Sequence, residues 1–242
     1  YGIPYTAPAA TPRTLDRIAT APAAAYGLRL LDTDYAGPAI RVRRSSDNAT
    51  TDIGFLTPSG RLNLVALTNF VGTGDGFVDT WYDQSGNGRN ATIPSGQTAP
   101  KIVIGGALVS RNGVPTLAFD GVSTGLRAAV PGPGGKNLLA TAVAQSTVTS
   151  STDLWGRTLS LGVPGVASWQ NAGSVTFTRY LGTSTFGVEN SDTGYQLTVS
   201  AMSPVTNGSM FVYSGEFSAT RHRGVMNGAP TADFTPLNAP DT

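Results

Sequence analysis

The feature that most constrains the fold of this chain is a succession of short segments in which apolar and polar residues alternate. In AIRVRRS (39–45), Ile40 and Val42 fall on one side and Arg41 and Arg43 on the other, the pattern of a strand with one buried face. Similar segments follow, separated by clusters of Gly, Pro, Asn and Ser: GFVDTWYDQ, KIVIG, PTLAFDG, NLLATAVAQ, TLSLGV, SVTFTRYL, STFGVEN, YQLTVSAM, MFVYSGEF and HRGVMNG. Many short strands in this arrangement predict an antiparallel all-β fold, a two-sheet jelly-roll sandwich.

Composition leaves room for only one or two short helices. Lys and Glu, strong polar helix formers, occur twice each, whereas Gly and Pro number 30 and 16. One helix is predicted over 21–37, where Pro22 suits a first turn and Leu28 and Leu31 share a face. The other is predicted within 61–72, where Leu and Phe recur at helical spacing.

The chain is predicted to have two parts. Residues 1–25 are rich in Pro, Ala and Thr, a composition typical of an extended arm or linker. Residues 26–242 are long enough to form one large sandwich.

Absent residues exclude several classes of site. The chain has no cysteine, which rules out disulfides and thiolate metal sites, and a single histidine, His222, which cannot build a multi-histidine metal centre. The formal net charge is +1, and the one basic cluster, Arg41, Arg43 and Arg44, forms no long stripe, so nucleic acid is not an expected partner. There is no run of about 18 apolar residues, so no membrane span is predicted.

The stretch WYDQSGNGRNAT (81–92) is the most turn-prone segment, and three interpretations of it compete. Asp83, Ser85 and Asn87 place oxygens as a calcium loop begins, but the twelfth position is Pro94 rather than a glutamate, so calcium is a weak alternative. In the second interpretation, Asp83 and Asn87 form Asx turns while the glycines take positive φ.

The third interpretation is a sugar-binding loop, because sugar rings pack on aromatic faces and their hydroxyls bond to carboxylate, amide and guanidinium groups. The candidate carbohydrate-binding residues are Trp81, Asp83, Asn87, Arg89, Trp155 and Trp169. Strict alternation would place Trp81 on the same face as Phe77 and Asp79, and would make either Trp81 or Tyr82 part of the core.

Glycoside hydrolysis requires two carboxyl groups across a cleft. Glu189, at the end of a predicted strand with Asp192 nearby, is the candidate, and Glu216 is a second glutamate with a solvent-facing pattern. The competing interpretation is that each is an ordinary surface carboxylate.

Three blocks in order, AYGLRLL…YAGPAIRVRRSSDNATTDIGF, FVDTWYDQSGNGRNAT and NGVPTLAFDG, resemble the concanavalin-like or laminin-G-like jelly-roll module of the arabinofuranosidase B family, a fold also found in bacteriophage tail and fibre proteins. The resemblance spans roughly residues 24–125 and implies a carbohydrate-facing sandwich. It also implies that Glu189, in a VEN sequence, is the equivalent of the nucleophile. The family's acid/base aspartate, in a later glycine-rich segment, and its paired cysteines have no counterpart in this sequence. The resemblance further implies that the module's closing strand is lacking, which would leave an open sheet edge that pairs with other chains.

Three functions are compatible with these observations. The leading hypothesis is a bacteriophage virion protein of the tail, fibre or decoration type, which binds surface polysaccharide and assembles as a homo-oligomer, or with other virion proteins, through residues 1–25 and the open edge. The alternatives are a secreted arabinofuranosidase-type glycoside hydrolase and a purely structural sandwich without ligand. The corresponding locations are the virion or the extracellular space, and no cofactor is expected.

Overall fold

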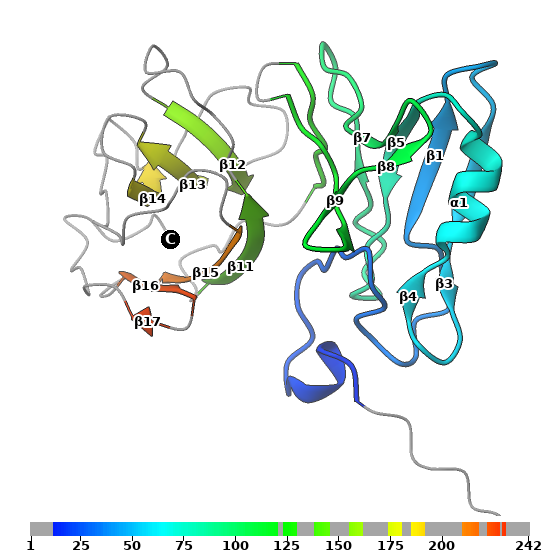
Figure 1. Ribbon diagram of the computed structural model, residues 1–242. Helices are drawn as coiled ribbons and strands as arrows, with labels where there is room; N and C mark the ends of the chain where they lie inside the picture. The colour runs from blue at the N-terminus through cyan, green and yellow to red at the C-terminus, as the bar shows by residue number, and fades with distance from the viewer. Residues whose placement is uncertain are drawn as a thin grey trace, which may run out of the picture. The chain divides into compact units, whose positions relative to one another are not determined.

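The computed structural model describes residues 12–120, 123–129, 138–145, 155–161, 174–180, 185–191, 210–217, 222–227 and 229–230 (Figure 1). The chain divides into two compact units, Tyr1–Ala129 (unit 1) and Val130–Thr242 (unit 2). Each unit builds its own sheets, because every described strand pairs only with strands of the same unit.

Unit 1 is built on one antiparallel sheet with the strand order β2-β1-β5-β7-β8, in which β6 also pairs with β5. Two small hairpins, β3–β4 and β9–β10, and the 3-10 helix η1 complete it. The elements are η1 (Leu15–Arg17), β1 (Ile40–Arg44), β2 (Thr50–Ile53), β3 (Phe55–Leu56), β4 (Arg61–Leu62), α1 (Leu64–Val71), β5 (Gly76–Trp81), β6 (Ala91–Thr92), β7 (Lys101–Ile104), β8 (Ala107–Leu108), β9 (Ser110–Arg111) and β10 (Val114–Pro115).

Helix α1 covers one face of β1 and β2 (Figure 1). Leu67 and Val71 of the helix are buried against Ile40 and Val42 of β1, as their spacing on one helical face requires. The helix begins at Asn63, whose side-chain oxygen accepts a hydrogen bond from the Ala66 N–H at 3.0 Å. The predicted helix within 61–72 is therefore confirmed.

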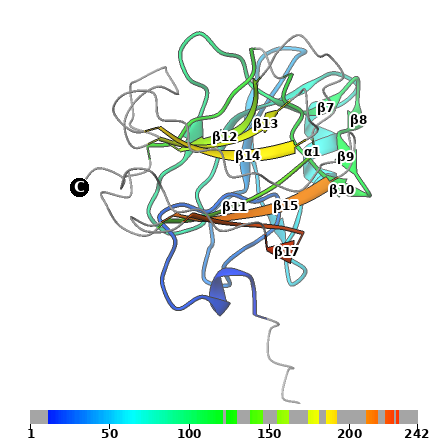
Figure 2. The same cartoon turned by 90° about the vertical axis from the view of Figure 1, so that its left-hand side faces the viewer.

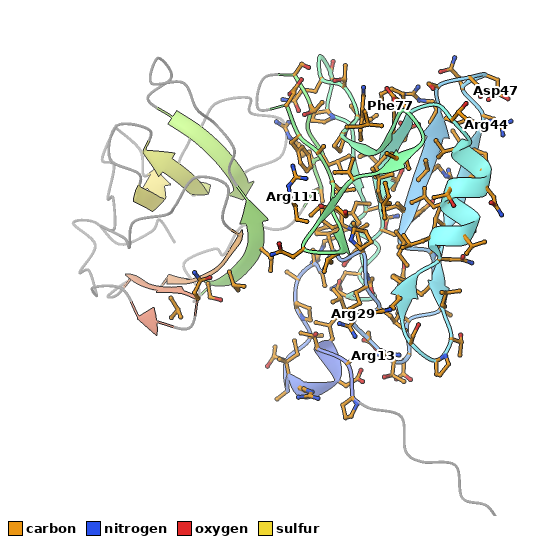
Figure 3. All side chains as sticks on the ribbon, in the orientation of Figure 1. Arg13, Arg29, Arg44, Asp47, Phe77 and Arg111 are labelled. Atoms are coloured by element: carbon orange, nitrogen blue, oxygen red, sulfur yellow. The ribbon has the colours of Figure 1, made fainter. Side chains whose placement is uncertain are left out.

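The opposite face of β1 carries charges that are matched across the strands. Arg41 pairs with Asp52 at 2.8 Å and Arg43 with Asp79 at 3.2 Å. At the end of the strand, Arg44 pairs with Asp47 at 2.7 Å, and Figure 3 shows both beside the end of α1. The basic cluster found in the sequence is thus paired with aspartates.

Unit 2 contains two antiparallel sheets, ordered β11-β15-β16-β17 and β12-β13-β14. Figure 2 shows β11 beside β15 and β12 beside β13 and β14. The strands are β11 (Leu138–Gln145), β12 (Trp155–Leu161), β13 (Ser174–Tyr180), β14 (Thr185–Ser191), β15 (Met210–Phe217), β16 (His222–Met226) and β17 (Ala229–Pro230). The two-residue β17 follows the turn at Asn227 and pairs with β16.

The antiparallel all-β prediction is confirmed, since the described residues contain one α-helix and otherwise strands, turns and loops, with a single 3-10 turn. The segment YQLTVSAM (195–202) lies outside the described residues. No helix in the described part of the chain is both long and apolar enough to cross a membrane.

The helix predicted over 21–37 does not form. Residues 27–31 instead form an irregular segment with one isolated bridge at Arg29, and the carboxamide of Gln84 bonds to three of their backbone groups. Those bonds replace the ones that a helix would supply, so a tertiary contact overrides the local periodicity.

The strand predicted over PTLAFDG (115–121) is reduced to Val114–Pro115 and one isolated bridge, Lys101 with Ala118. The Asp120 carboxylate accepts hydrogen bonds from the backbone and hydroxyls of Ser123 and Thr124. This turn diverts the backbone before a ladder can extend.

The described part of the predicted arm, residues 12–25, makes hydrogen bonds to the rest of unit 1. Leu15 donates its backbone N–H to the Leu31 carbonyl at 2.7 Å, and Asp16 accepts from the N–H of Thr33 at 2.9 Å. The guanidinium of Arg13 donates to the Ser59 carbonyl at 3.0 Å. This part of the predicted arm is docked onto unit 1.

Candidate functional site

The loop after β5, residues 82–90, is anchored by Asp83, which is only 3% exposed. Its Oδ1 accepts hydrogen bonds from the N–H groups of Ala25 and Ser85 at 2.8 and 2.9 Å. Its Oδ2 accepts from the Ser85 hydroxyl at 2.8 Å and the Arg89 N–H at 3.0 Å. Burial alone raises the pKa of Asp83, but these hydrogen bonds outweigh it and hold the pKa below its ordinary value.

Gln84 is the buried polar residue of this loop that the sequence did not single out. Its side chain is 1% exposed and uses both ends of the carboxamide. Nε2 donates to the carbonyls of Gly27 and Arg29 at 3.0 and 3.1 Å, and Oε1 accepts from the Leu31 N–H at 2.8 Å. A polar residue in a turn-rich stretch gives no sequence signal of burial, so only the folded chain reveals this role.

Asn87 and Arg89 hold the preceding segment in place. Nδ2 of Asn87 donates to the carbonyls of Pro22 and Ala23 at 3.0 and 3.2 Å, and the Arg89 guanidinium also donates to the Ala23 carbonyl. The Tyr26 hydroxyl donates in turn to the Arg89 carbonyl. Burial, with the negative charge of Asp83, raises the pKa of Tyr26 to about 12. These hydrogen bonds therefore hold the loop and residues 22–26 together.

Trp81 lies on the core side of β5, and the strict alternation expected for this strand is wrong. Trp81 is paired with Ile40 and Val78 with Val42, and a register shift falls between them. Because Ile40 and Val42 share the buried face of β1, their partners share it too. The Trp81 ring packs on Tyr26 with centroids 5.9 Å apart.

The geometry of the loop is that of the Asx-turn interpretation at Asp83, where the Ser85 N–H bonds to the carboxylate, with Gly86 and Gly88 at φ of +83° and +68°. Asn87 differs from this interpretation, since its amide donates to residues 22 and 23. Both oxygens of Asp83 already accept protein hydrogen bonds, so a calcium ion would have to displace them. In the described ranges, no three acidic or histidine side chains gather in an arrangement able to hold a metal ion.

The remaining candidates lie in unit 2. Glu189 belongs to β14, the last strand in the order β12-β13-β14, and is in register with Thr176 of β13. Trp155 is the first residue of β12. Trp169 and Asp192 lie outside the described residues. The structure thus brings together Trp81, Asp83, Asn87 and Arg89 within unit 1.

Comparison with known proteins first defines a class of fold. The chain is similar to a solved GH54 α-L-arabinofuranosidase soaked with a cyclic sulfate inhibitor, at a TM-score of 0.62 and 20% identity over 90% of this chain and 51% of that one. It is also similar to an arabinofuranosidase complexed with arabinofuranosyl-α-1,2-xylobiose, at a TM-score of 0.63 and 20% identity over 91% and 51% of the two chains. The fold is an all-β sandwich, as predicted.

Sequence comparison identifies the kind of protein that the chain resembles. Residues 17–111 match the family model described as alpha-L-arabinofuranosidase B, catalytic. A probable alpha-L-arabinofuranosidase B of Aspergillus fumigatus is 37% identical over 75 residues, which are 30% of this chain and 15% of that protein. The Aspergillus terreus protein of the same description is 33% identical over 118 residues, 48% and 23% of the two chains. The chain therefore spans about half the length of the solved structures and matches under a quarter of the curated relatives.

These matches correct the leading functional hypothesis. The bacteriophage virion interpretation, with its tail-fibre role and glycan adhesion, is contradicted, because the family model, the curated relatives and the solved structures are all arabinofuranosidases. The jelly-roll resemblance that suggested a phage context is a property of the fold, which many functions share. The resemblance to the arabinofuranosidase catalytic domain itself is supported.

Proposed function

We propose that this chain is an arabinofuranosidase-type glycoside hydrolase module that releases terminal α-L-arabinofuranosyl residues from polysaccharide. The observation that carries the proposal is the match of residues 17–111 to a catalytic-domain family model. The fold likeness over 90% of the chain extends the same resemblance to unit 2. An extracellular location belongs to the proposal, since polysaccharides that carry arabinofuranosyl residues lie outside cells.

In this proposal, unit 1 and unit 2 have different roles. Unit 1 supplies the frame in which Asp83 and Gln84 tie the loop after β5 to residues 25–31. Unit 2 supplies Glu189 as the nucleophile that attacks the anomeric carbon. Departure of the leaving oxygen also requires a carboxylic acid that protonates it, and no residue of this sequence is assigned to that role. Trp155 and Trp169 are the residues proposed to stack on sugar rings.

The test is hydrolysis of a neutral aryl α-L-arabinofuranoside by the purified chain and two matched variants. Glu189→Gln keeps the size of the side chain but removes the nucleophile, so we expect at least about a thousandfold loss of kcat. Glu216→Gln makes the same chemical change in β15 and is expected to retain kcat within about twofold. Absence of hydrolysis by the wild-type chain, or equal activity of Glu189→Gln and wild type, would overturn the proposal.

A further inference from the structure

Two arginines of unit 1 face each other beside the β3–β4 hairpin, whereas the main sheet of the unit pairs opposite charges. Arg29 and Arg61 are partners in an isolated antiparallel bridge. Residues directly opposite in such a pair share one face, with Cβ atoms about 5 Å apart, and like charges there are destabilising. In β1 and β2, the same geometry places Arg41 opposite Asp52.

Both side chains of the pair are available to solvent. Arg29 and Arg61 are exposed, and among the residues that the structure describes neither side chain has a hydrogen-bond or ion-pair partner. Every N–H of two planar guanidinium groups is thus free to bind an anion.

The backbone under the pair is held from both sides. The Arg29 carbonyl accepts from Nε2 of buried Gln84 at 3.1 Å, and the next residue, Leu30, donates its N–H to the Gly60 carbonyl at 2.8 Å. The two arginines therefore project from fixed positions, and little backbone ordering is needed when a ligand binds.

A third guanidinium lies next to this pair. Arg13 donates to the carbonyls of Pro58 and Ser59, and its Nη1 lies 2.7 Å from the point where a Cβ on Gly60 would be. Figure 3 shows Arg13 and Arg29 at the same end of unit 1. Asp16, the carboxylate near Arg13, is engaged by Thr33 and by the Arg13 backbone N–H.

The geometry points to an anion-binding site formed by Arg29 and Arg61, flanked by Arg13, that binds the carboxylate groups of an acidic polysaccharide. Paired guanidinium forks match the two oxygens of a carboxylate. Both arginines lie on an exposed surface beside the β3–β4 hairpin. Such a surface suits a repeating polymer better than a small enclosed ion. The choice of polysaccharide as the source of the carboxylate rests on the proposed function.

The direct test is binding of the full chain to polygalacturonate, with the carboxyl-reduced form of the same polymer as the uncharged control. Retardation in affinity gel electrophoresis at low salt measures the interaction without any hydrolysis. We expect retardation by polygalacturonate and none by the reduced polymer. Equal retardation by both, or by neither, would overturn the inference.

Three variants separate this site from general surface charge. Arg61→Gln is expected to weaken binding about tenfold, the effect of losing a charge-assisted hydrogen bond, and Arg61→Glu to abolish it. Arg127→Gln removes the same charge from a position whose bridge partner is the neutral Thr92, and should bind within about twofold of wild type. Equal losses in Arg61→Gln and Arg127→Gln would show that the binding is nonspecific and would refute the site.

Thermal melting supplies an independent readout. Arg61→Glu creates an opposite-charge pair with Arg29, so without ligand its melting temperature should rise by about 1–3 °C. A fall in melting temperature would show that the two side chains do not face each other. Tighter binding to duplex DNA than to polygalacturonate would assign the site to nucleic acid instead.

The outcomes of this test are distinguishable from those of the proposed function. Hydrolysis of the neutral aryl arabinofuranoside by the wild-type chain reports the enzyme activity alone. Loss of that activity with retained, Arg61-dependent binding would leave the anion site in place and remove the hydrolase. Hydrolysis without binding to polygalacturonate would support the hydrolase and remove the anion site.

Discussion

At the scale of single residues, the structure shows how a buried polar side chain can determine the path of a distant segment. The carboxamide of Gln84 satisfies two carbonyls and one N–H of residues 27–31. Unpaired, each of these part-buried groups would cost up to about 1–3 kcal/mol. The non-helical path of this segment is therefore fixed by Gln84, more than fifty residues away in sequence.

Replacing Gln84 should expose this dependence. We expect Gln84→Leu to lower the free energy of unfolding by about 3 kcal/mol or more, because three backbone groups lose their partner. Gln84→Glu should be pH-dependent: burial raises the pKa of an introduced glutamate, so its folded form is favoured when protonated and stability falls as pH rises. Chemical denaturation at pH 4 and pH 7 measures both effects.

The matched control for this experiment is Gln97→Glu, at an exposed position of unit 1. It should show no comparable difference between the two pH values. A Gln84→Glu variant as stable at pH 7 as at pH 4 would contradict the assigned role.

The lowered pKa of Asp83 predicts an acid-dependent contribution to stability. A carboxylate whose pKa is lower in the folded state stabilises the fold above its unfolded pKa, about 3.9, and that contribution disappears as pH falls through the folded value. Asp83→Asn should therefore be less stable than wild type at pH 7, and the difference should shrink below about pH 4. Denaturant melts across pH 2–7 test this.

Exposed Gln97 provides the comparison, since Gln97→Asn changes no titratable group and should leave the pH dependence of stability unchanged. A difference between wild type and Asp83→Asn that stays constant down to pH 2 would be the contrary result.

At the scale of elements, the sequence was informative where one face of a segment is buried and the other is not. The alternation of Ile40 and Val42 with Arg41 and Arg43 correctly predicted β1, because burial and charge fall on opposite faces. Alternation failed in β5, where the register shift places Val78 and Trp81 on one face. A bulge depends on the partner strand, so no local pattern reveals it.

Helix α1 offers a test of the same reasoning. Leu67 is fully buried, whereas Val65, on the same helix, is 66% exposed. Leu67→Ala should lower the free energy of unfolding by about 2–5 kcal/mol, and Val65→Ala should change it by less than about 0.5 kcal/mol. Similar losses in the two variants would mean that the helix does not pack as described.

At the scale of the whole molecule, the chain consists of two units, each with its own described sheets. Composition and alternation predicted the all-β class. They gave no indication of a boundary near Ala129, because strands on both sides of it have the same pattern. The candidate site was likewise predictable in part: Asp83 and Asn87 stood out as turn residues, but their partners at 22–25 lie too far away in sequence to be inferred.

Unit 1 should fold without unit 2. Its strands find all their described partners within residues 12–129, around a core that includes Ile40, Leu67, Val78 and Ile102. We expect the fragment 12–129 to show a β-type circular dichroism spectrum and a cooperative thermal transition. A fragment without such a transition, or one whose melt is unaffected by Leu67→Ala, would contradict this expectation.

The bond between Ala25 and the Asp83 carboxylate closes a loop of 58 residues, and this has a consequence for how the protein is made. Residues 12–31 leave the ribosome before the side chains that hold them. At about 5–20 residues per second, the interval is about 3–12 s. During biosynthesis, residues 12–31 are thus among the last parts of unit 1 to reach their final position. A chaperone or protease encountering the nascent chain would meet them while Asp83 and Gln84 are still unsynthesised.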